Sequence, residues 1–178
     1  MSLKTRSFIG IAVGVLLAIP CCITGCGVYS MTGAATTAKT IQIEQFYNNT
    51  DLAPPNIAQL FTNSLKDYYQ RNSSLRVIEK GGELQVEGVI SEYRINPIAP
   101  QAGNPDANNS AALTRLTIGV KVSYVDGLEP KNSFKDKSFS FYKDFDNNEN
   151  FTTIQEDLQK KIFEQILIDI FNATIGNW

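Results

Sequence analysis

The sequence predicts an α+β fold in which two helices pack on one face of a mostly antiparallel sheet of four to five strands. Two segments carry apolar residues at helical spacing, and the segments around them alternate apolar and polar residues as half-buried strands do. The resulting order is one strand, one helix, four strands and a final helix. About 140 residues are enough to bury one hydrophobic core, so we expect residues 39–178 to form a single domain.

The first strand is predicted over residues 39–46, where Ile41 and Ile43 alternate with polar residues. Pro54 and Pro55 then favour a helix start, because proline is tolerated in the first helical turn. A helix of about 16 residues is expected next, because apolar residues recur there at steps of three and four. Its apolar face comprises Ile57, Leu60, Phe61, Leu65 and Tyr68. This helix and its flanking strands can form a right-handed parallel crossover.

Two further strands are predicted over residues 76–80 and 83–95. Gly81 and Gly82 lie between them, and paired glycines supply the positive φ angles that a tight hairpin needs. We therefore expect these two strands to pair as a hairpin. The apolar residues of the second strand change face near Gly88, which predicts a β-bulge at that position.

Residues 96–111 are rich in proline and asparagine, so they cannot form a regular element and are predicted to be a long loop. Such loops are either functional or dispensable insertions, and the sequence leaves both readings open.

The clearest strand pattern covers residues 113–125. One face of this predicted strand is apolar and the other is polar, and a turn near Asp126 and Gly127 leads to a strand over residues 133–143. The apolar side chains are Leu116, Ile118, Val120, Val122 and Tyr124 on the first strand, and Phe139 and Phe141 on the second. The sheet is therefore expected to have one polar face.

The last element is a helix predicted over residues 154–173. Thr153, with Glu156 three residues later, matches a capping box at its start. The wide apolar stripe of this helix comprises Ile154, Leu158, Ile162, Phe163, Ile166, Leu167, Ile170 and Phe171. These eight side chains are predicted to cover the apolar face of the sheet.

The N-terminus has the features of an export signal, with Lys4 and Arg6 before a short apolar run. That run ends at Pro20 and is shorter than the roughly 20 apolar residues of a membrane-spanning helix, so a permanent membrane span is the weaker reading. Residues 23–26, Ile-Thr-Gly-Cys, form a lipobox. We therefore predict a lipoprotein signal peptide over residues 1–25, a lipid on Cys26 and a flexible, lipidated tether over residues 26–38.

The residue types limit the chemistry. The chain has no histidine, Cys21 and Cys22 leave with the signal peptide, and Cys26 is acylated. These absences exclude thiol nucleophiles, serine–histidine triads, zinc sites with nitrogen or sulfur ligands, and a disulfide in the mature chain. No glycine-rich phosphate loop precedes a helix. An enzyme that uses only carboxylates remains an alternative, and no cofactor is predicted.

One cluster has the spacing of a calcium loop, with Asp144, Asp146 and Asn148 at its first, third and fifth positions. The sixth position is Glu149 where such loops need glycine, and the twelfth is Gln155 where they need glutamate. The segment is therefore interpreted as a polar turn between a strand and a helix, and no metal site is predicted.

Basic residues gather on the predicted polar face. Arg94, Arg115 and Lys121 lie there, and Lys135 and Lys137 are on the neighbouring strand. They can hold an anionic group, but acidic residues on the same strands leave an ordinary solvated face as the alternative. The chain has a formal net charge of −2, so general affinity for nucleic acid or for an anionic membrane is not expected.

Four motifs give the sequence a family resemblance: LQVEGVISEYRINPIAPQAG, AALTRLTIGVKVSYVDG, KSFSFYKDF and DIFNATIGNW. In order and spacing they resemble the LptE-type lipopolysaccharide assembly lipoproteins of the Gram-negative outer membrane. The likeness extends over nearly the whole mature chain. One departure is that Thr114 precedes Arg115 where the family pattern has asparagine.

The resemblance implies a protein without enzymatic activity, anchored by its lipid in the outer membrane. Such proteins sit in the lumen of the LptD β-barrel, assist its assembly and help deliver lipopolysaccharide to the outer leaflet. Arg94, Arg115 and Lys121 are then expected to contact lipopolysaccharide. The alternative is a free-standing envelope lipoprotein that binds a small ligand or a polysaccharide.

Overall fold

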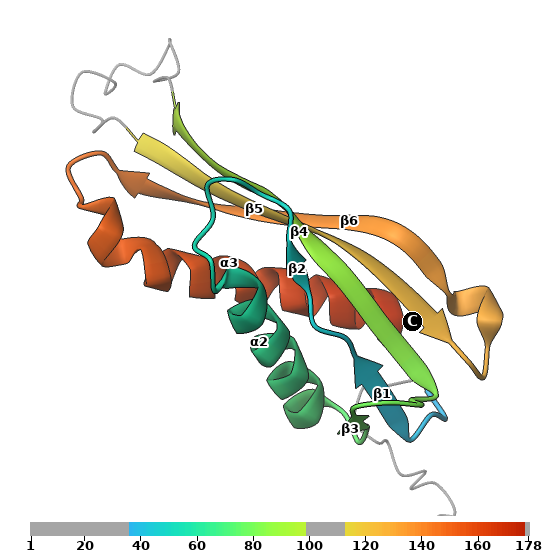
Figure 1. Ribbon diagram of the computed structural model, residues 1–178. Helices are drawn as coiled ribbons and strands as arrows, with labels where there is room; N and C mark the ends of the chain where they lie inside the picture. Colours follow the sequence, from blue (N-terminus) through green and yellow to red (C-terminus); the bar gives the residue numbers. More distant parts are fainter. Residues whose placement is uncertain (1–35, 99–112, 177–178) are drawn as a thin grey trace, which may run out of the picture. The chain divides into compact units, whose positions relative to one another are not determined.

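The structure is a computed structural model that describes residues 36–98 and 113–176, all within one compact unit, Thr32–Trp178. The predicted signal peptide, Cys26, most of the tether and residues 99–111 of the predicted loop lie outside the described residues. Residues 96–98, also predicted as loop, instead extend the strand before it and pair with residues 113–115. Figure 1 shows the elements, which are β1 (Thr40–Ile43), β2 (Tyr47–Asn48), α2 (Ile57–Asn72), β3 (Arg76–Ile78), β4 (Leu84–Ile98), β5 (Leu113–Asp126), the short 3-10 helix η3 (Pro130–Asn132), β6 (Phe134–Asp146) and α3 (Phe151–Thr174).

The sheet confirms the predicted α+β class but is larger and more mixed than expected. It has six strands, in the order β3-β1-β4-β5-β6, with β2 also beside β4. The β4–β5 and β5–β6 ladders are antiparallel and long. β1 pairs in parallel with both β3 and β4, and β2 pairs in parallel with β4. The strands on either side of α2, β1 and β3, are thus parallel neighbours, as the predicted crossover requires.

The predicted hairpin at Gly81 and Gly82 is wrong, because β1 lies between β3 and β4. The residues that connect β3 to β4 cross β1 instead. Gly81 has a φ of +75°, and its N–H donates to Gln42 Oε1 at 2.7 Å. Gly82 passes so close to β1 that a Cβ there would lie 2.5 Å from the backbone nitrogen of Gln42. The glycines therefore serve a tight crossing, which needs the same conformational freedom as a hairpin.

The predicted bulge is also misplaced. Gly88 pairs regularly with Val122, and the register shifts between Ile90 and Glu92. Gly88 is required for close packing, because a Cβ at that position would lie 2.6 Å from the Phe46 ring. The later bulge returns Tyr93 to the buried face that Ile90 occupies.

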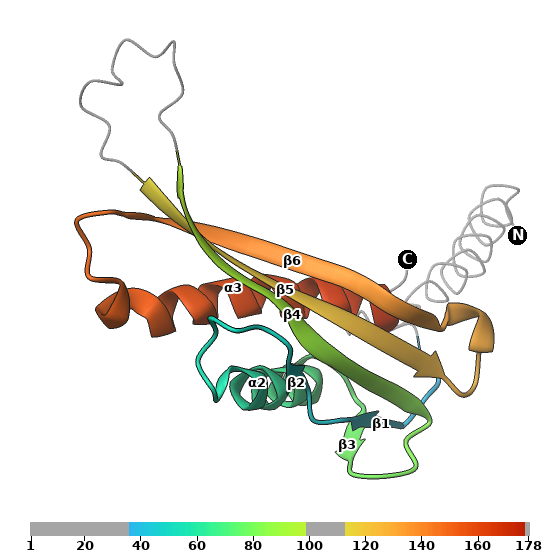
Figure 2. The same ribbon diagram turned by 45° about the horizontal axis from the view of Figure 1, so that its top comes forward.

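Both helices cover the same side of the sheet, as Figures 1 and 2 show. Phe61 of α2 links the layers, with its ring centroid 5.0 Å from that of Phe46 and 5.1 Å from that of Phe163 on α3. The buried residues of α2 are Ile57, Ala58, Phe61, Thr62, Leu65 and Tyr69. The predicted face was therefore slightly rotated, since Leu60 is 41% exposed and the fully buried tyrosine is Tyr69.

The start of α3 differs from the predicted capping box. The helix begins at Phe151, and the Asn150 side chain accepts a hydrogen bond from the Thr152 N–H at 3.0 Å. Thr153 therefore lies inside the first turn. The Phe151 ring packs 5.5 Å from Phe145 at the end of β6, which favours the earlier start. Of the eight predicted stripe residues, seven are buried and Ile154 is partly buried.

One buried polar contact joins the two helices. Tyr69 Oη lies 2.5 Å from Thr174 Oγ1, and burial raises the pKa of this tyrosine. Within residues 36–98 and 113–176, no helix combines the length and hydropathy that a membrane crossing requires.

Candidate functional site

The side of β4, β5 and β6 turned away from the helices is the polar face predicted from the sequence. Its residues include Glu92, Arg94 and Asn96 on β4, Arg115, Thr117 and Lys121 on β5, and Ser138, Ser140, Tyr142 and Asp144 on β6. The antiparallel register sets them in rows across the strands. Arg94, Thr117 and Tyr142 form one row, and Asn96, Arg115 and Asp144 form the next.

Arg115 is held in place by two neighbours on β6. Its Nε donates to Asp144 Oδ1 at 2.7 Å, and its Nη2 donates to Asp144 Oδ2 at 2.9 Å. The guanidinium carbon lies 3.6 Å from the centroid of the Tyr142 ring. The hydrogen bond from Arg115 holds the pKa of the Asp144 carboxyl below its ordinary value. This arginine is therefore fixed in orientation and its charge is largely compensated.

Arg94 is also paired. Its Nε donates to Glu92 Oε1 at 2.9 Å, within its own strand, and Nη2 of the same arginine contacts the same oxygen. The register places Arg94 beside Thr117 and close to Arg115. These two predicted site residues are thus brought together, each with a carboxylate.

Lys121 lies apart from the two arginines. It is exposed and pairs across the ladders with Val89 and Ser138. It is six positions along β5 from Arg115, which corresponds to roughly 20 Å. Among the described residues Lys121 makes no ion pair. The three predicted cations therefore share a face but do not converge on one anion site.

Sequence reasoning missed the carboxylates that compensate the arginines. Arg115 and Asp144 are 29 positions apart and meet only because β5 and β6 pair in one register. Glu92 is two positions before Arg94, a spacing that places both side chains on one face of β4. No local motif predicts the pairing of Arg115 with Asp144.

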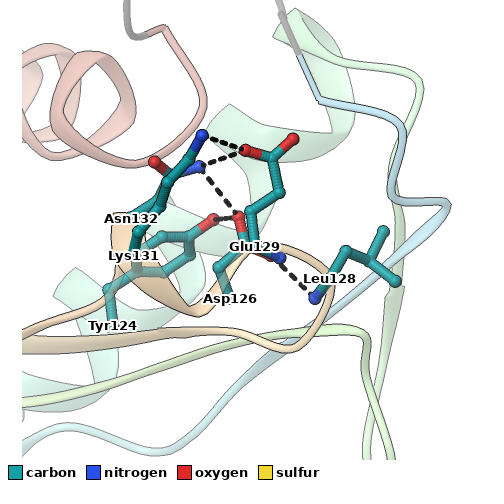
Figure 3. Close-up of polar contacts among 6 residues, drawn as sticks. All are labelled: Tyr124, Asp126, Leu128, Glu129, Lys131 and Asn132. Carbon is teal, nitrogen blue, oxygen red and sulfur yellow. Dashed lines mark hydrogen bonds and ion pairs between the residues drawn. The ribbon is translucent and has the colours of Figure 1, made fainter.

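A cavity of about 200 Å³ lies beside the turn after β5. Asp126, which is only 5% exposed, lines this cavity, and Figure 3 shows its polar contacts. The Asp126 carboxylate accepts hydrogen bonds from the N–H groups of Leu128 at 2.9 Å and Glu129 at 2.8 Å, and Tyr124 Oη lies 3.4 Å from it. This carboxylate organises the turn before η3, so it does not offer a free general base.

The calcium-like segment after β6 is used as a turn. Asp144 binds Arg115, and Asp146 Oδ1 accepts a hydrogen bond from the Asn148 N–H at 2.8 Å. Within the described part of the chain, no group of three or more acidic, histidine or cysteine side chains is placed to hold a metal ion.

A groove of about 630 Å³ lies between α2 and α3 on the outer side of the helices. Its walls include Leu60, Tyr68, Phe163 and Leu167, and charged side chains such as Lys160 line it too. The groove is large enough for a small ligand, although its wide opening leaves it in contact with solvent.

Comparisons with known proteins add a family and a fold. The family model LptE, described as lipopolysaccharide-assembly, matches residues 38–174. No curated protein sequence matches the chain.

Several solved structures share the fold at low sequence identity. The hypothetical protein CT253 from Chlamydia trachomatis has 10% identity and a TM-score of 0.52, covering 79% of this chain and 99% of that one. Uncharacterized lipoprotein B from Nitrosomonas europaea has 11% identity and a TM-score of 0.53, covering 84% of this chain and 92% of that one. Protein XCC0632 from Xanthomonas campestris has 9% identity and a TM-score of 0.52, covering 80% and 86%.

Proposed function

The chain belongs to the LptE lipopolysaccharide-assembly family, and on that premise we propose that it partners an LptD-type β-barrel of the outer membrane. In this role it is a plug and assembly factor for the barrel, and it helps deliver lipopolysaccharide to the outer leaflet. Family membership supports a role in lipopolysaccharide assembly, and the family is one of non-enzymatic lipoproteins. The barrel partner and the outer-membrane location are the proposed steps.

The lipid anchor is part of the proposal. The lipobox at residues 23–26 supports a lipid on Cys26 and a tether over residues 26–38, shortly before β1 begins at Thr40. A lipoprotein attached in this way stays at the membrane without a spanning helix. Anchoring in the outer membrane would keep the domain beside the barrel while the barrel folds.

The polar face is the observation that carries the proposal. A domain inside a water-lined barrel must present hydrophilic surface to the wall and bury its apolar side within itself. The three strands of the face are 13 to 15 residues long, and both helices pack on their other side. Because Arg94 and Arg115 are paired with carboxylates, the face is hydrophilic without a strong local charge. Such a surface suits a wide, polar and weakly charged contact.

Site-specific photo-crosslinking in living cells tests the partnership. A photoreactive residue at Thr117 or Ser140 probes the polar face, and one at Lys160 probes the outer side of the helices. We expect crosslinks from Thr117 and Ser140 to a single large barrel protein. No crosslink from either position, with barrel levels normal after the protein is depleted, would reject the proposal.

The groove between α2 and α3 supports a second candidate, a free-standing lipoprotein that binds a small ligand or a polysaccharide. The two candidates predict different companions in a detergent extract. A barrel protein recovered in equal amount with the tagged chain supports the assembly role, whereas recovery without a protein partner supports the free-standing binder.

A further inference from the structure

β6 forms one outer edge of the sheet, with β5 as its neighbour on the other side. Figure 2 shows no other described strand beyond it. The hydrogen-bond pattern between neighbouring strands determines which N–H and carbonyl groups of β6 point away from β5. The Glu44 N–H donates to the Val86 carbonyl at 2.9 Å and the Asn49 N–H to the Ile90 carbonyl at 3.0 Å, so the helix-facing residues of β4 direct their backbone groups away from β5.

Bonded and non-bonded residue pairs alternate along antiparallel ladders. The helix-facing residues of β5 therefore bond to β6, and the polar-face residues of β6 direct their N–H and carbonyl groups outward. In the middle of the strand these residues are Ser138, Ser140 and Tyr142. Their backbone groups are an open template for another strand.

The two ends of β6 are protected against pairing, but its middle is not. Near the start of the strand, Asp136 has a φ of +51° at a register shift, and Lys135 and Lys137 flank it. Lys143 follows the middle segment. Bulges and lysines are the usual devices that keep edge strands apart. Between them, residues 138–142 read SFSFY, which is uncharged and has high β-propensity.

Lysines and phenylalanines form a row along the helix-facing side of this edge. Lys137 and Lys143 pair with the buried Val122 and Leu116, so they point to the same side as Phe139 and the partly buried Phe141. Lys137 Nζ lies 5.6 Å from the Phe139 ring, and Lys143 Nζ lies 5.8 Å from the Phe141 ring. Neither lysine is in an ion pair with any residue that the structure describes. A partner strand with carboxylates opposite the two lysines would complement their charge.

The same charges disfavour pairing with a second copy. A symmetric antiparallel pair centred on Ser140 places Lys137 opposite Lys143 and Asp136 opposite Asp144. A pair centred on Phe139 places Lys135 opposite Lys143. Like charges directly opposite each other destabilise a sheet.

We propose that β6 takes an extended segment of a partner protein as an added antiparallel strand along Ser138–Tyr142. Carboxylates of that segment lie opposite Lys137 and Lys143, and apolar side chains lie opposite Phe139 and Phe141. The inference concerns the edge of the sheet, and it does not depend on the polar face contacting a barrel.

A short peptide tests this on the full lipidated chain in detergent micelles. The probe is a heptapeptide, Glu-Thr-Val-Thr-Val-Thr-Glu, acetylated at its N-terminus and amidated at its C-terminus, whose two carboxylates have the spacing of Lys137 and Lys143. Nuclear magnetic resonance should show chemical-shift changes confined to β6 and slower amide exchange at Ser138, Ser140 and Tyr142. A peptide with lysine in place of both glutamates should bind about tenfold more weakly.

Two variants separate the backbone and charge contributions. Ser140→Pro removes an outward N–H and should weaken binding about tenfold, while Ser140→Thr keeps this N–H and should bind as the parent does. The β5 amides report whether the proline variant still folds. Lys137→Glu with Lys143→Glu should reverse the preference between the two peptides. Equal binding of both peptides, full binding by the folded Ser140→Pro variant, or dimerisation of the chain through β6 would overturn the proposal.

Discussion

At the scale of single residues, the polar face shows what a sequence can and cannot reveal. The alternation in β5 correctly predicted that Arg115 and Lys121 share one side of the sheet. It could not show that Asp144 compensates Arg115, because that contact depends on the register between two strands. Gly88 is a similar case, since a Cβ there would meet the Lys121 carbonyl oxygen and the Phe46 ring, both from distant segments. Contacts between distant segments are decided by packing, which local patterns do not encode.

Replacing Arg94, Arg115 and Lys121 together by alanine tests whether the face contacts lipopolysaccharide. We expect about tenfold weaker binding of purified lipopolysaccharide at low ionic strength, because exposed charge contacts each contribute little and are screened by salt. Titration followed by fluorescence or calorimetry measures the change. Because Arg94 and Arg115 already bind carboxylates, Lys121 should account for the largest single share.

The matched control removes the same charge from the helices. Lys66, Lys160 and Lys161 replaced together by alanine should leave the affinity within about twofold. If the sheet variant binds lipopolysaccharide as tightly as the control does, these three residues have no part in recognition.

At the scale of elements, periodicity predicted well wherever an element is long and one-sided. The helix after Pro54 and Pro55, the strand over residues 113–125 and the last helix are all present, with boundaries shifted by a few residues. The connection between β3 and β4 was mispredicted because a glycine pair fits both a hairpin and a tight crossing. Only the placement of β1 between the two strands decides between them, and that pairing is remote in sequence.

The start of α3 gives a test at this scale. Asn150→Ala should lower the free energy of unfolding by about 1 kcal/mol, because it removes the side-chain acceptor for the Thr152 N–H. Urea unfolding followed by circular dichroism measures the loss. Thr153→Ala is the control and should change stability by less than about 0.5 kcal/mol, because Thr153 lies within the first turn. A larger loss of stability from Thr153→Ala than from Asn150→Ala would instead support the predicted capping box at Thr153.

At the scale of the whole molecule, the fold places apolar and polar surface on opposite sides of one sheet. The helices cover one side, and the other carries paired charges and hydroxyl groups. A large contact made by such a face has no small dominating cluster, so single surface substitutions there should be tolerated. The fold class could be predicted from the order of elements, but the partner could not, because nothing in the periodicity of a strand identifies what its exposed side touches.

The last prediction concerns attachment of the whole molecule to the membrane. The proposed function assigns the lipid to the Cys26 thiol, so with Cys26→Ala uncleaved or mislocalised precursor should accumulate. Two or three acyl chains hold a protein at a membrane far more firmly than the marginal binding of one chain, so little of the variant should remain in the outer-membrane fraction. Palmitate labelling, cell fractionation and intact mass measure the outcome.

Cys21→Ala and Cys22→Ala are matched controls, because the proposed cleavage after residue 25 removes both cysteines with the signal peptide. Both variants should be processed, labelled and localised as the parent is. Loss of palmitate labelling in either variant would mean that the lipid is attached to that earlier cysteine and not to Cys26. Processing of Cys26→Ala after residue 25, with recovery in the same membrane fraction, would show that the lipid is not what holds the domain at the membrane.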